Sequence, residues 1–225
     1  MSSTALLVVA KAPEPGHAKT RLCPPLSPEG AAQVAAASLL DTMSAVLAVP
    51  EATAFVAWTG TLQRAVRSAE IERALAEVTL LAQRGDGLGE RLAAAHSDVA
   101  EASTLPVLQI GMDTPQATAR VLTDSTEPLH RQGGPDAVLG LAEDGGWWAL
   151  GLRDPRHARV LHEVPMSSED TGERTLQALR AAGLSVELLP RLRDVDTMDD
   201  AIEVAAHVPR SHFADAISAC TAESA

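Results

Sequence analysis

Short apolar runs alternate along the chain with longer segments in which apolar residues recur at helical spacing. Residues 5–10 form the first run, which is wholly apolar and is typical of a strand buried on both faces of a parallel sheet. Comparable runs predict further strands at residues 52–58, 78–82, 106–110, 137–141, 147–152 and 186–189. Helical segments separate the strands, so the pattern predicts an α/β sheet with helices on both faces.

The first predicted helix has a clear start signal. Ser27 and Pro28 are typical of an N-cap followed by proline at the first helical position, and apolar residues then recur up to Pro50. Further helices are predicted at 62–76, at 89–102, in a short stretch through residue 122, at 172–182 and at 198–207. Residues 125–135 are polar and turn-rich, which predicts a surface connection. We expect one domain at 1–208 and a C-terminal tail at 209–225 with weak helical character.

The composition indicates a core with few aromatic side chains and an acidic surface. Of the 225 residues, 46% are hydrophobic and 2% are aromatic, so alanine, leucine and valine must fill the core. The formal net charge is -12, which argues against nucleic acid as a partner, because binding a phosphate backbone needs a basic face. A single nucleotide needs only a few local cations. The 30 aspartates and glutamates also leave oxygen ligands for a divalent metal.

The two cysteines, Cys23 and Cys220, lie near opposite ends of the chain without metal-type spacing. Two free thiols are typical of a reducing compartment. The apolar run near the N-terminus is too short for a signal peptide and lacks a basic segment before it. No apolar stretch approaches the length of a membrane span. These features predict a cytoplasmic protein.

A cationic loop follows the first predicted strand and carries Lys11, Lys19 and Arg21. Cations at the carboxyl end of a buried strand are well placed to hold the phosphates of a nucleotide. Residues 16–20 resemble part of a P-loop, but the position of its leading glycine holds Lys11, so a P-loop ATPase is not predicted. The alternative is a proline-rich surface turn with ordinary basic residues.

Aspartates follow two other predicted strands. Asp113 comes directly after the strand at 106–110, where it is either a metal ligand or the N-cap of the next helix. Asp194 and Asp196 follow the last strand, and Thr197 with Asp200 resembles a capping box. Asp196 is therefore the candidate for the second carboxylate, with Asp194 left open. Mg²⁺ is typically held by one or two carboxylates together with substrate phosphates.

Two further loops carry candidate chemistry. Asp144 precedes two glycines and two tryptophans between predicted strands, so it belongs either to a ligand-binding turn or to a tight hairpin. Ser167, Ser168 and Thr171 form a hydroxyl-rich loop whose alternative role is helix capping. The seven histidines show no metal-binding spacing, and no Ser-His-Asp arrangement is indicated.

Five segments, in this order, resemble a known family: K-A-P-E-P-G-H-A-K-T-R-L, Q-R-G-D-G-L-G-E-R-L, G-M-D-T-P, E-D-G-G-W-W-A-L-G and D-V-D-T-M-D-D. They are similar to bacterial proteins of the DUF2064 group, which belongs with glycosyltransferase-A-like proteins in the nucleotide-diphospho-sugar transferase superfamily. The K-T-R-L part of the first segment and the D-V-D-T part of the last also look like 2-phospholactate guanylyltransferases, which share the fold. The resemblance implies a single three-layer α/β/α Rossmann-like glycosyltransferase-A domain with a mostly parallel mixed sheet.

The resemblance also implies roles for particular residues. The first loop would bind the nucleotide phosphates through Lys11, Gly16, Lys19, Thr20 and Arg21. The loop after the third strand would approach the base through Gln83, Gly85, Asp86, Gly87 and Gly89. Asp113 and Asp196 would bind Mg²⁺ or Mn²⁺, and Asp144 would face the sugar or acceptor. The sequence departs from the family pattern in lacking a D-x-D motif at Asp113 and a G-x-G-x-R-M loop at the N-terminus.

Three functions follow from these expectations. The first is metal-dependent transfer of a sugar from a nucleotide sugar to a small acceptor, with Asp113, Asp144 and Lys19 as catalytic residues. The second keeps the site but joins a nucleoside triphosphate to a small phosphorylated acid and releases pyrophosphate. The third is a nucleotide-binding protein without catalysis. The sequence leaves the base, the sugar, the acceptor and the oligomeric state open.

Overall fold

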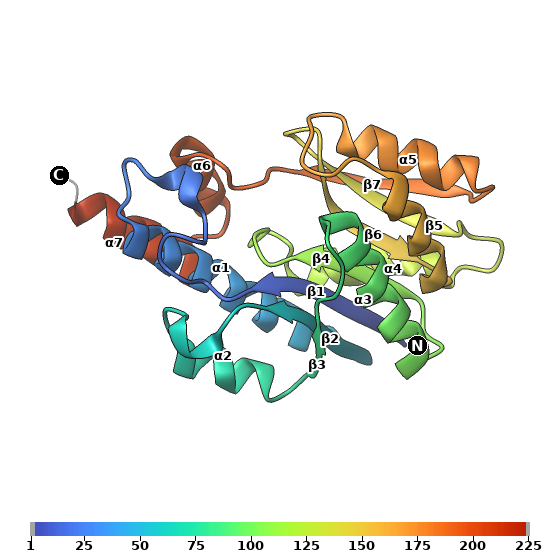
Figure 1. The fold of residues 1–225 in the computed structure, drawn as a ribbon, viewed down its shortest axis with the longest axis horizontal. Coiled ribbons are helices and arrows are strands. Elements are labelled where there is room, and N and C mark those ends of the chain that lie inside the picture. Colours follow the sequence, from blue (N-terminus) through green and yellow to red (C-terminus); the bar gives the residue numbers. More distant parts are fainter. Residues whose placement is uncertain (1–2, 224–225) are drawn as a thin grey trace.

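The computed structural model describes residues 3–223 and contains one seven-stranded sheet (Figure 1). The strand order is β3-β2-β1-β4-β6-β5-β7. The bounds of the strands are Thr4–Lys11 (β1), Ala52–Thr59 (β2), Thr79–Ala82 (β3), Val107–Gly111 (β4), Ala137–Ala142 (β5), Trp147–Leu152 (β6) and Val186–Leu192 (β7). β6 runs antiparallel to both its neighbours, and the other adjacent strands are parallel. This confirms the predicted mostly parallel mixed sheet.

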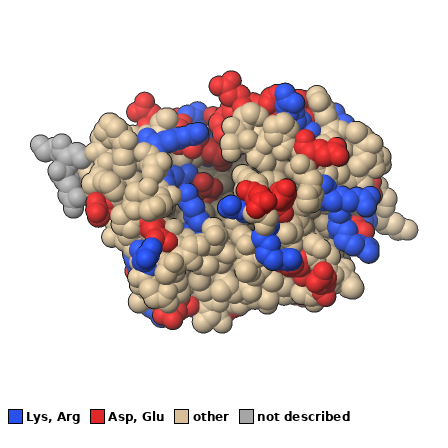
Figure 2. Space-filling model, in the orientation of Figure 1, with Lys and Arg blue, Asp and Glu red and all other residues tan. Residues whose placement is uncertain are grey.

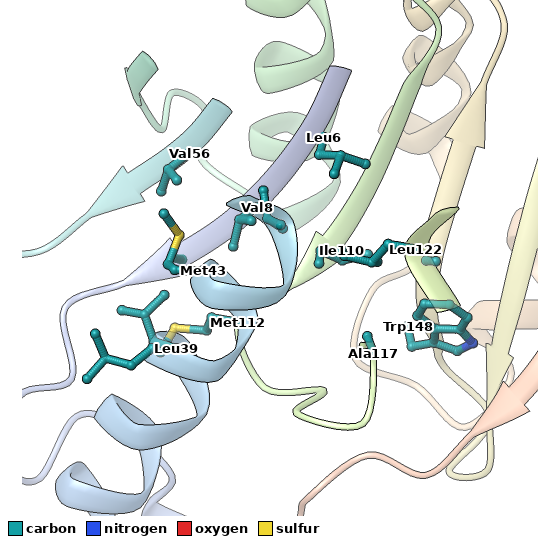
Figure 3. Packing of buried hydrophobic residues seen from close by; sticks show 14 of the residues in the cluster. Leu6, Val8, Leu39, Met43, Val56, Ile110, Met112, Ala117, Leu122 and Trp148 are labelled. Carbon is teal, nitrogen blue, oxygen red and sulfur yellow. The ribbon is translucent and has the colours of Figure 1, made fainter. Parts of the chain in front are cut away.

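Helices cover both faces of the sheet and complete the predicted three-layer α/β/α architecture. The helix bounds are Pro28–Leu47 (α1), Ser68–Leu75 (α2), Leu88–Ala102 (α3), Ala119–His130 (α4), Thr171–Ala181 (α5), Met198–His207 (α6) and His212–Glu223 (α7), with 3-10 turns at Thr20–Leu22 (η1), Leu62–Arg64 (η2) and Pro155–Glu163 (η3). α1, α2 and α4 pack on one face, where alternate residues of β1 such as Leu6 and Val8 meet Leu39 and Met43 of α1 (Figure 3). The other face carries α3, η3 and α5.

Helix α1 begins as predicted, because the side chain of Ser27 accepts a hydrogen bond from the backbone N–H of Gly30. The expectation that no apolar stretch approaches the length of a membrane span was wrong for α1, which is long and apolar enough by composition to cross one. In the fold, however, α1 packs between the sheet and α7, and about two thirds of its most apolar window is buried. The length and hydropathy of α1 therefore reflect its place in the core.

The last helix, α7, lies beside α1 (Figure 1). Phe213 and Ile217 are buried against α1 and α6. The carboxylate of Asp41 on α1 accepts hydrogen bonds from the backbone N–H groups of His212 and Phe213, at 3.0 and 2.8 Å. These contacts attach the C-terminal segment to the domain through both apolar packing and a cap.

Two expectations about local structure were wrong. Residues 125–130 are not a surface connection but the second half of α4, because its hydroxyls bond back to the helix itself; Ser125 Oγ donates to the carbonyl of Val121 at 2.7 Å. That helix also buries Leu122 and Leu129. The predicted helix at 62–76 is instead a 3-10 turn followed by the shorter α2, since Arg67 between them adopts a left-handed conformation.

Candidate active site

The sheet topology brings the carboxyl ends of β1, β4, β5 and β7 to one edge. These four strands run in the same direction, and β6 runs in the opposite one. Ligands of open α/β sheets bind at the edge where the carboxyl ends of the parallel strands lie. A cleft with a volume of about 910 Å³ opens there. The surface is hollowed in this region, with acidic and basic side chains around the hollow (Figure 2). The predicted residues that line the cleft are Lys11, Lys19, Thr20, Arg21, Gln83, Asp113, Asp144 and Asp196.

Lys19 lies at the centre of the polar contacts in the cleft. Its Nζ donates to Oδ2 of Asp113 at 2.9 Å and to the backbone carbonyl of Val195 at 2.6 Å. Its side chain is 13% exposed, and its backbone has φ 47° and ψ 40°. A residue other than glycine in this left-handed region is uncommon and costs free energy. The strain fits a lysine that is held in place to direct its charge inward.

The other two cations of the first loop lie closer to solvent. Arg21 is 73% exposed, and its guanidinium binds Oδ2 of Asp196 at 2.7 Å. Lys11 is exposed and its Nζ donates to the backbone carbonyl of His17 at 2.8 Å. Both side chains line the same cleft as Lys19. Three positive groups therefore face one side of the cleft.

Four carboxylates face these cations from three strand ends. The Lys19 ammonium holds the pKa of Asp113 below its usual range. Burial, together with the negative charges of Asp113, Asp144 and Asp196, raises the pKa of Asp194 to about 7, although Lys19 acts in the opposite direction. Such crowding of negative charge disfavours the ionised form of Asp194 in the absence of a further cation.

These carboxylates are suited to bind a divalent cation whose remaining ligands a substrate would supply. Within residues 3–223, no three His, Cys, Asp or Glu side chains are arranged as a ready-made metal site. Hard cations such as Mg²⁺, however, commonly take one or two carboxylates and fill their remaining positions with substrate phosphates and water. Asp113 and Asp194 offer such oxygen ligands next to the phosphate-type loop. Burial and the neighbouring carboxylates raise the pKa of Asp194, and a cation bound beside it would offset this negative charge.

Asp113 is not the cap of the following helix. The N-cap of α4 is Thr118, whose side chain accepts from the backbone N–H of Val121 at 3.3 Å. The capping box at Thr197 and Asp200 is present as predicted, with both reciprocal hydrogen bonds. This leaves Asp113, Asp194 and Asp196 outside the helix caps and available to the cleft.

The turn that carries Asp144 is a tight hairpin between β5 and β6. Oδ1 of Asp144 accepts from the backbone N–H of Gly146 at 2.8 Å. Gly145 has φ +91°, and a Cβ there would lie 1.8 Å from the carbonyl oxygen of Glu169. The glycines thus let the turn pack against the start of α5, while Asp144 itself faces the cleft.

The hydroxyls of the loop before α5 mostly bond within that loop. Thr171 Oγ1 donates to the carbonyl of Pro165 at 3.0 Å and accepts from the backbone N–H of Ser168 at 3.0 Å. Ser168 Oγ donates to Asp170 at 2.7 Å. Ser167 lies in the cleft lining with Ser168 and Thr171. These bonds order the loop, but neither hydroxyl caps α5, whose N-cap is Asp170 and has no side-chain cap hydrogen bond.

Several residues of the predicted base-binding segment lie outside the cleft lining. These are Gly85, Asp86, Gly87 and Gly89, together with Gly16 of the first loop. Gly89 allows α3 to approach η3, since a Cβ would lie 2.3 Å from the carbonyl oxygen of Leu161. Gln83 does line the cleft, and its Nε2 donates to the carbonyls of Ala10 and Ala57 at 2.8 and 2.9 Å. Gln83 therefore joins the ends of β1 and β2.

Two residues that line the cleft, Arg91 and Gln109, were not singled out from the sequence. Arg91 lies inside a quoted motif, and Gln109 is a polar residue in an otherwise apolar strand. Asp194 was left as an alternative to Asp196, and its burial is visible only in the fold. Outside the cleft lining, Arg193 precedes Asp194 and binds Glu143 at 2.8 Å and Glu203 at 3.0 Å. It links the hairpin turn, the last loop and α6.

Comparison with known proteins agrees with this architecture. The family described as "Uncharacterized protein conserved in bacteria (DUF2064)" matches residues 42–168. No curated protein sequence matches the chain. A provisionally named nucleotide-diphospho-sugar transferase from Desulfovibrio desulfuricans G20 has a TM-score of 0.81 and 26% identity, over 95% of this chain and 94% of that one.

More distant solved structures share the fold. A 4-diphosphocytidyl-2C-methyl-D-erythritol synthase from Anaerococcus prevotii DSM 20548 has a TM-score of 0.58 and 10% identity, over 93% of this chain and 97% of that one. The glucosyl-3-phosphoglycerate synthase of Mycobacterium tuberculosis, solved in complex with Mn²⁺, uridine diphosphate and glucosyl-3-phosphoglycerate, has a TM-score of 0.53 and 11% identity. It aligns over 86% of this chain and 71% of that one. At these identities the likeness shows that the fold is shared.

Proposed function

The chain belongs to the DUF2064 family of bacterial proteins, and from that premise we propose that it is a transferase acting on a nucleotide-activated substrate. Its reaction would move a sugar from a nucleotide sugar to a small acceptor. The observation that carries the proposal is the position of Lys19, between Asp113 and the last loop at the carboxyl edge of the sheet. The fold of the D. desulfuricans protein over nearly the whole chain supports the same class of enzyme.

The chain's own cations would hold and stabilise the diphosphate. Lys19 and Arg21 would bind its oxygens, and Lys11 would add a third positive charge at the cleft rim. Cations that face the oxygens on which charge develops stabilise the leaving diphosphate in the transition state. The exposed guanidinium of Arg21 can exchange Asp196 for a phosphate at little cost, because surface ion pairs contribute little free energy.

Asp113 would hold a divalent cation, Mg²⁺ or Mn²⁺, together with Asp194 or Asp196. The influence of the Asp113 charge on Asp194 favours Asp194 as the second ligand, whereas Asp196 is paired with Arg21. When bound, such a cation would supply charge neutralisation at the diphosphate. Asp144, at the cleft end of the hairpin, would orient or deprotonate the acceptor hydroxyl.

A second candidate is nucleotidyl transfer, which the three cations facing the cleft also suit. Lys11, Lys19 and Arg21 would hold a triphosphate while a small phosphorylated acid attacks its α-phosphate and pyrophosphate leaves. The fold of the A. prevotii synthase is compatible with this reaction. Both functions would take place in the cytoplasm, in keeping with the two free cysteines.

The two reactions differ in the product released from the nucleotide. The protein is incubated with nucleoside triphosphates or nucleotide sugars, Mn²⁺ and a panel of small acceptors. Release of a nucleoside diphosphate supports glycosyl transfer, and release of pyrophosphate supports nucleotidyl transfer. Calorimetric titration with the nucleotides alone gives an independent readout. Absence of nucleotide binding, with and without Mn²⁺, would overturn both.

A further inference from the structure

Gln109 is a buried polar residue in the middle of the sheet. It lies on β4 between Leu7 of β1 and Leu150 of β6, and it is 2% exposed. Its Oε1 contacts Nε2 of His96 on α3 at 3.1 Å. Burial lowers the pKa of His96 to about 4, so this ring is neutral near pH 7 and donates its Nε2–H to Gln109.

This contact fixes which end of the Gln109 amide is available. Because the carbonyl oxygen is bound by His96, the NH₂ group is the free end. No partner within the described part of the chain accepts from it, and Gln109 belongs to the cleft lining. Among the described residues, the Gln109 amide nitrogen is not one of the fully buried polar atoms that lack a partner, so it reaches the cleft, where water or a ligand can accept its hydrogen bonds. The cleft thus has a fixed donor in its floor.

Arg91 lies on the same side of the cleft. It belongs to the face of α3 that also carries Leu88, Leu92 and His96, and its Nε donates to the backbone carbonyl of Gly85 at 3.1 Å. Among residues 3–223, none of the ion pairs within 4.0 Å involves the Arg91 guanidinium. The remaining N–H groups of a cleft-lining arginine are therefore free to bind an anion.

These two donors are separate from the phosphate-type loop. α3 packs on the face of the sheet to which Ala5 and Leu7 point, whereas Ala18 of the loop packs in the cluster on the α1 face. Leu88, Leu92, Trp147 and Met166 line the cleft along with Arg91 and Gln109. The cleft thus receives the cations of the first loop, which packs on the α1 face of the sheet, and the donors of Arg91 and Gln109, which lie with α3 on the other face.

We propose that Arg91 and Gln109 form a second anion-binding position, which holds the carboxylate or phosphate of an acidic acceptor. The inference rests on the proposed transferase function and specifies its second substrate as a small organic acid or phosphate ester. Arg91 supplies the charge. Gln109 is a specificity residue, and His96 is a positioning residue that sets the direction of its amide.

The test uses three probes that share a three-carbon skeleton: glycerol, glycerate and glycerol 3-phosphate. Each is titrated calorimetrically into the full-length protein saturated with Mg²⁺ and whichever of UDP, CDP, GDP or ADP binds. Saturation occupies the phosphate-type loop, so added anions report on the second position. We expect at least one anionic probe to bind and glycerol not to bind. The difference between glycerate and glycerol 3-phosphate tells whether a carboxylate or a phosphate is preferred.

Two variants and a control locate the binding. Arg91→Gln should weaken binding of the anionic probe about 10- to 100-fold, the loss expected for a hydrogen bond to a charged group. Gln109→Glu keeps an acceptor for His96 but places negative charge in the cleft, so it should weaken the probe at least as much. Arg84→Gln is the matched control, because Arg84 pairs with Asp98 and lies outside the cleft lining. Circular dichroism checks the fold of each variant.

The outcomes separate this inference from the proposed function. If no nucleotide binds the wild-type protein, the proposed function fails. If nucleotides bind but neither anionic probe does, or if Arg91→Gln leaves probe binding unchanged, the acidic-acceptor position is wrong while the transferase function stands. If Arg91→Gln weakens the nucleoside diphosphate as much as the probe, the pair contacts the nucleotide, which also overturns the inference.

Discussion

The ammonium nitrogen of Lys19 lies 2.9 Å from Oδ2 of Asp113, although the two residues are 94 positions apart in the sequence. The same nitrogen donates to the carbonyl of Val195. Lys19 therefore connects the loop after β1 with the ends of β4 and β7. This contact joins the cationic and the acidic sides of the cleft. A change of either residue should therefore alter the binding properties of both sides.

Lys19→Met should weaken binding of a nucleoside diphosphate about 10- to 100-fold, because it removes a charge-assisted hydrogen bond to phosphate. Binding of the unphosphorylated nucleoside should change much less. Isothermal titration of both ligands measures the difference. Lys11→Met is the control, since Lys11 is exposed and contacts a backbone carbonyl, and its loss should be smaller. Equal losses for diphosphate and nucleoside would indicate that the loop is only structural.

Asp113→Ala should abolish the part of nucleotide binding that depends on Mg²⁺ or Mn²⁺ and leave the fold intact. The helix after it is capped by Thr118 rather than by Asp113, so the cap survives the change. Titrations of nucleotide with metal and with EDTA measure the effect. Thr118→Ala is the converse variant and should lower the free energy of unfolding by about 1 kcal/mol. Unfolding of Asp113→Ala would contradict this assignment.

The fold was predictable because its signals are local. The apolar run of β1 and the Ser27–Pro28 cap each depend on neighbouring residues, and alternating strands and helices leave few arrangements of the sheet. The second half of α4 was missed because Ser125 and Thr126 look like turn residues in sequence. Their hydroxyls are satisfied within the helix, at Val121 and Thr123, which only the folded backbone makes possible.

The candidate site was partly predictable for a related reason. Lys19 and Asp113 follow strands, and strand ends converge at one edge in any parallel sheet. The choice between Asp194 and Asp196 depends on which side chain turns inward, and their sequence positions do not determine this. Gln109 was hidden because a single polar residue in an apolar strand gains meaning only when His96 is placed against it.

Gly145→Ala should destabilise the protein by several times more than Gly183→Ala. Both glycines have positive φ, +91° and +82°, but a Cβ at 145 would lie 1.8 Å from the carbonyl oxygen of Glu169, whereas none of the surrounding atoms lies within 4 Å at 183. The cost at 183 should be about 1 kcal/mol, the penalty for a side chain in the left-handed region. Urea unfolding of both variants measures the difference, and similar midpoints would show that the hairpin does not pack on the start of α5.

His96 makes the stability of the protein depend on pH. Burial lowers its pKa from 6.5 to about 4 in the folded state, so the unfolded chain binds more protons between these values. The contribution of neutral His96 is complete above pH 6.5 and is lost as the pH falls toward 4, by on the order of 3 kcal/mol. His96→Gln keeps a donor for Gln109 but cannot titrate. The free energy of unfolding of both proteins is measured in urea from pH 7 to pH 4. As the pH falls, the wild type should lose more of this free energy than His96→Gln does. His207→Gln, at an exposed position on α6, should retain the wild-type slope, and a constant difference between wild type and His96→Gln would show that His96 is not buried in its neutral form.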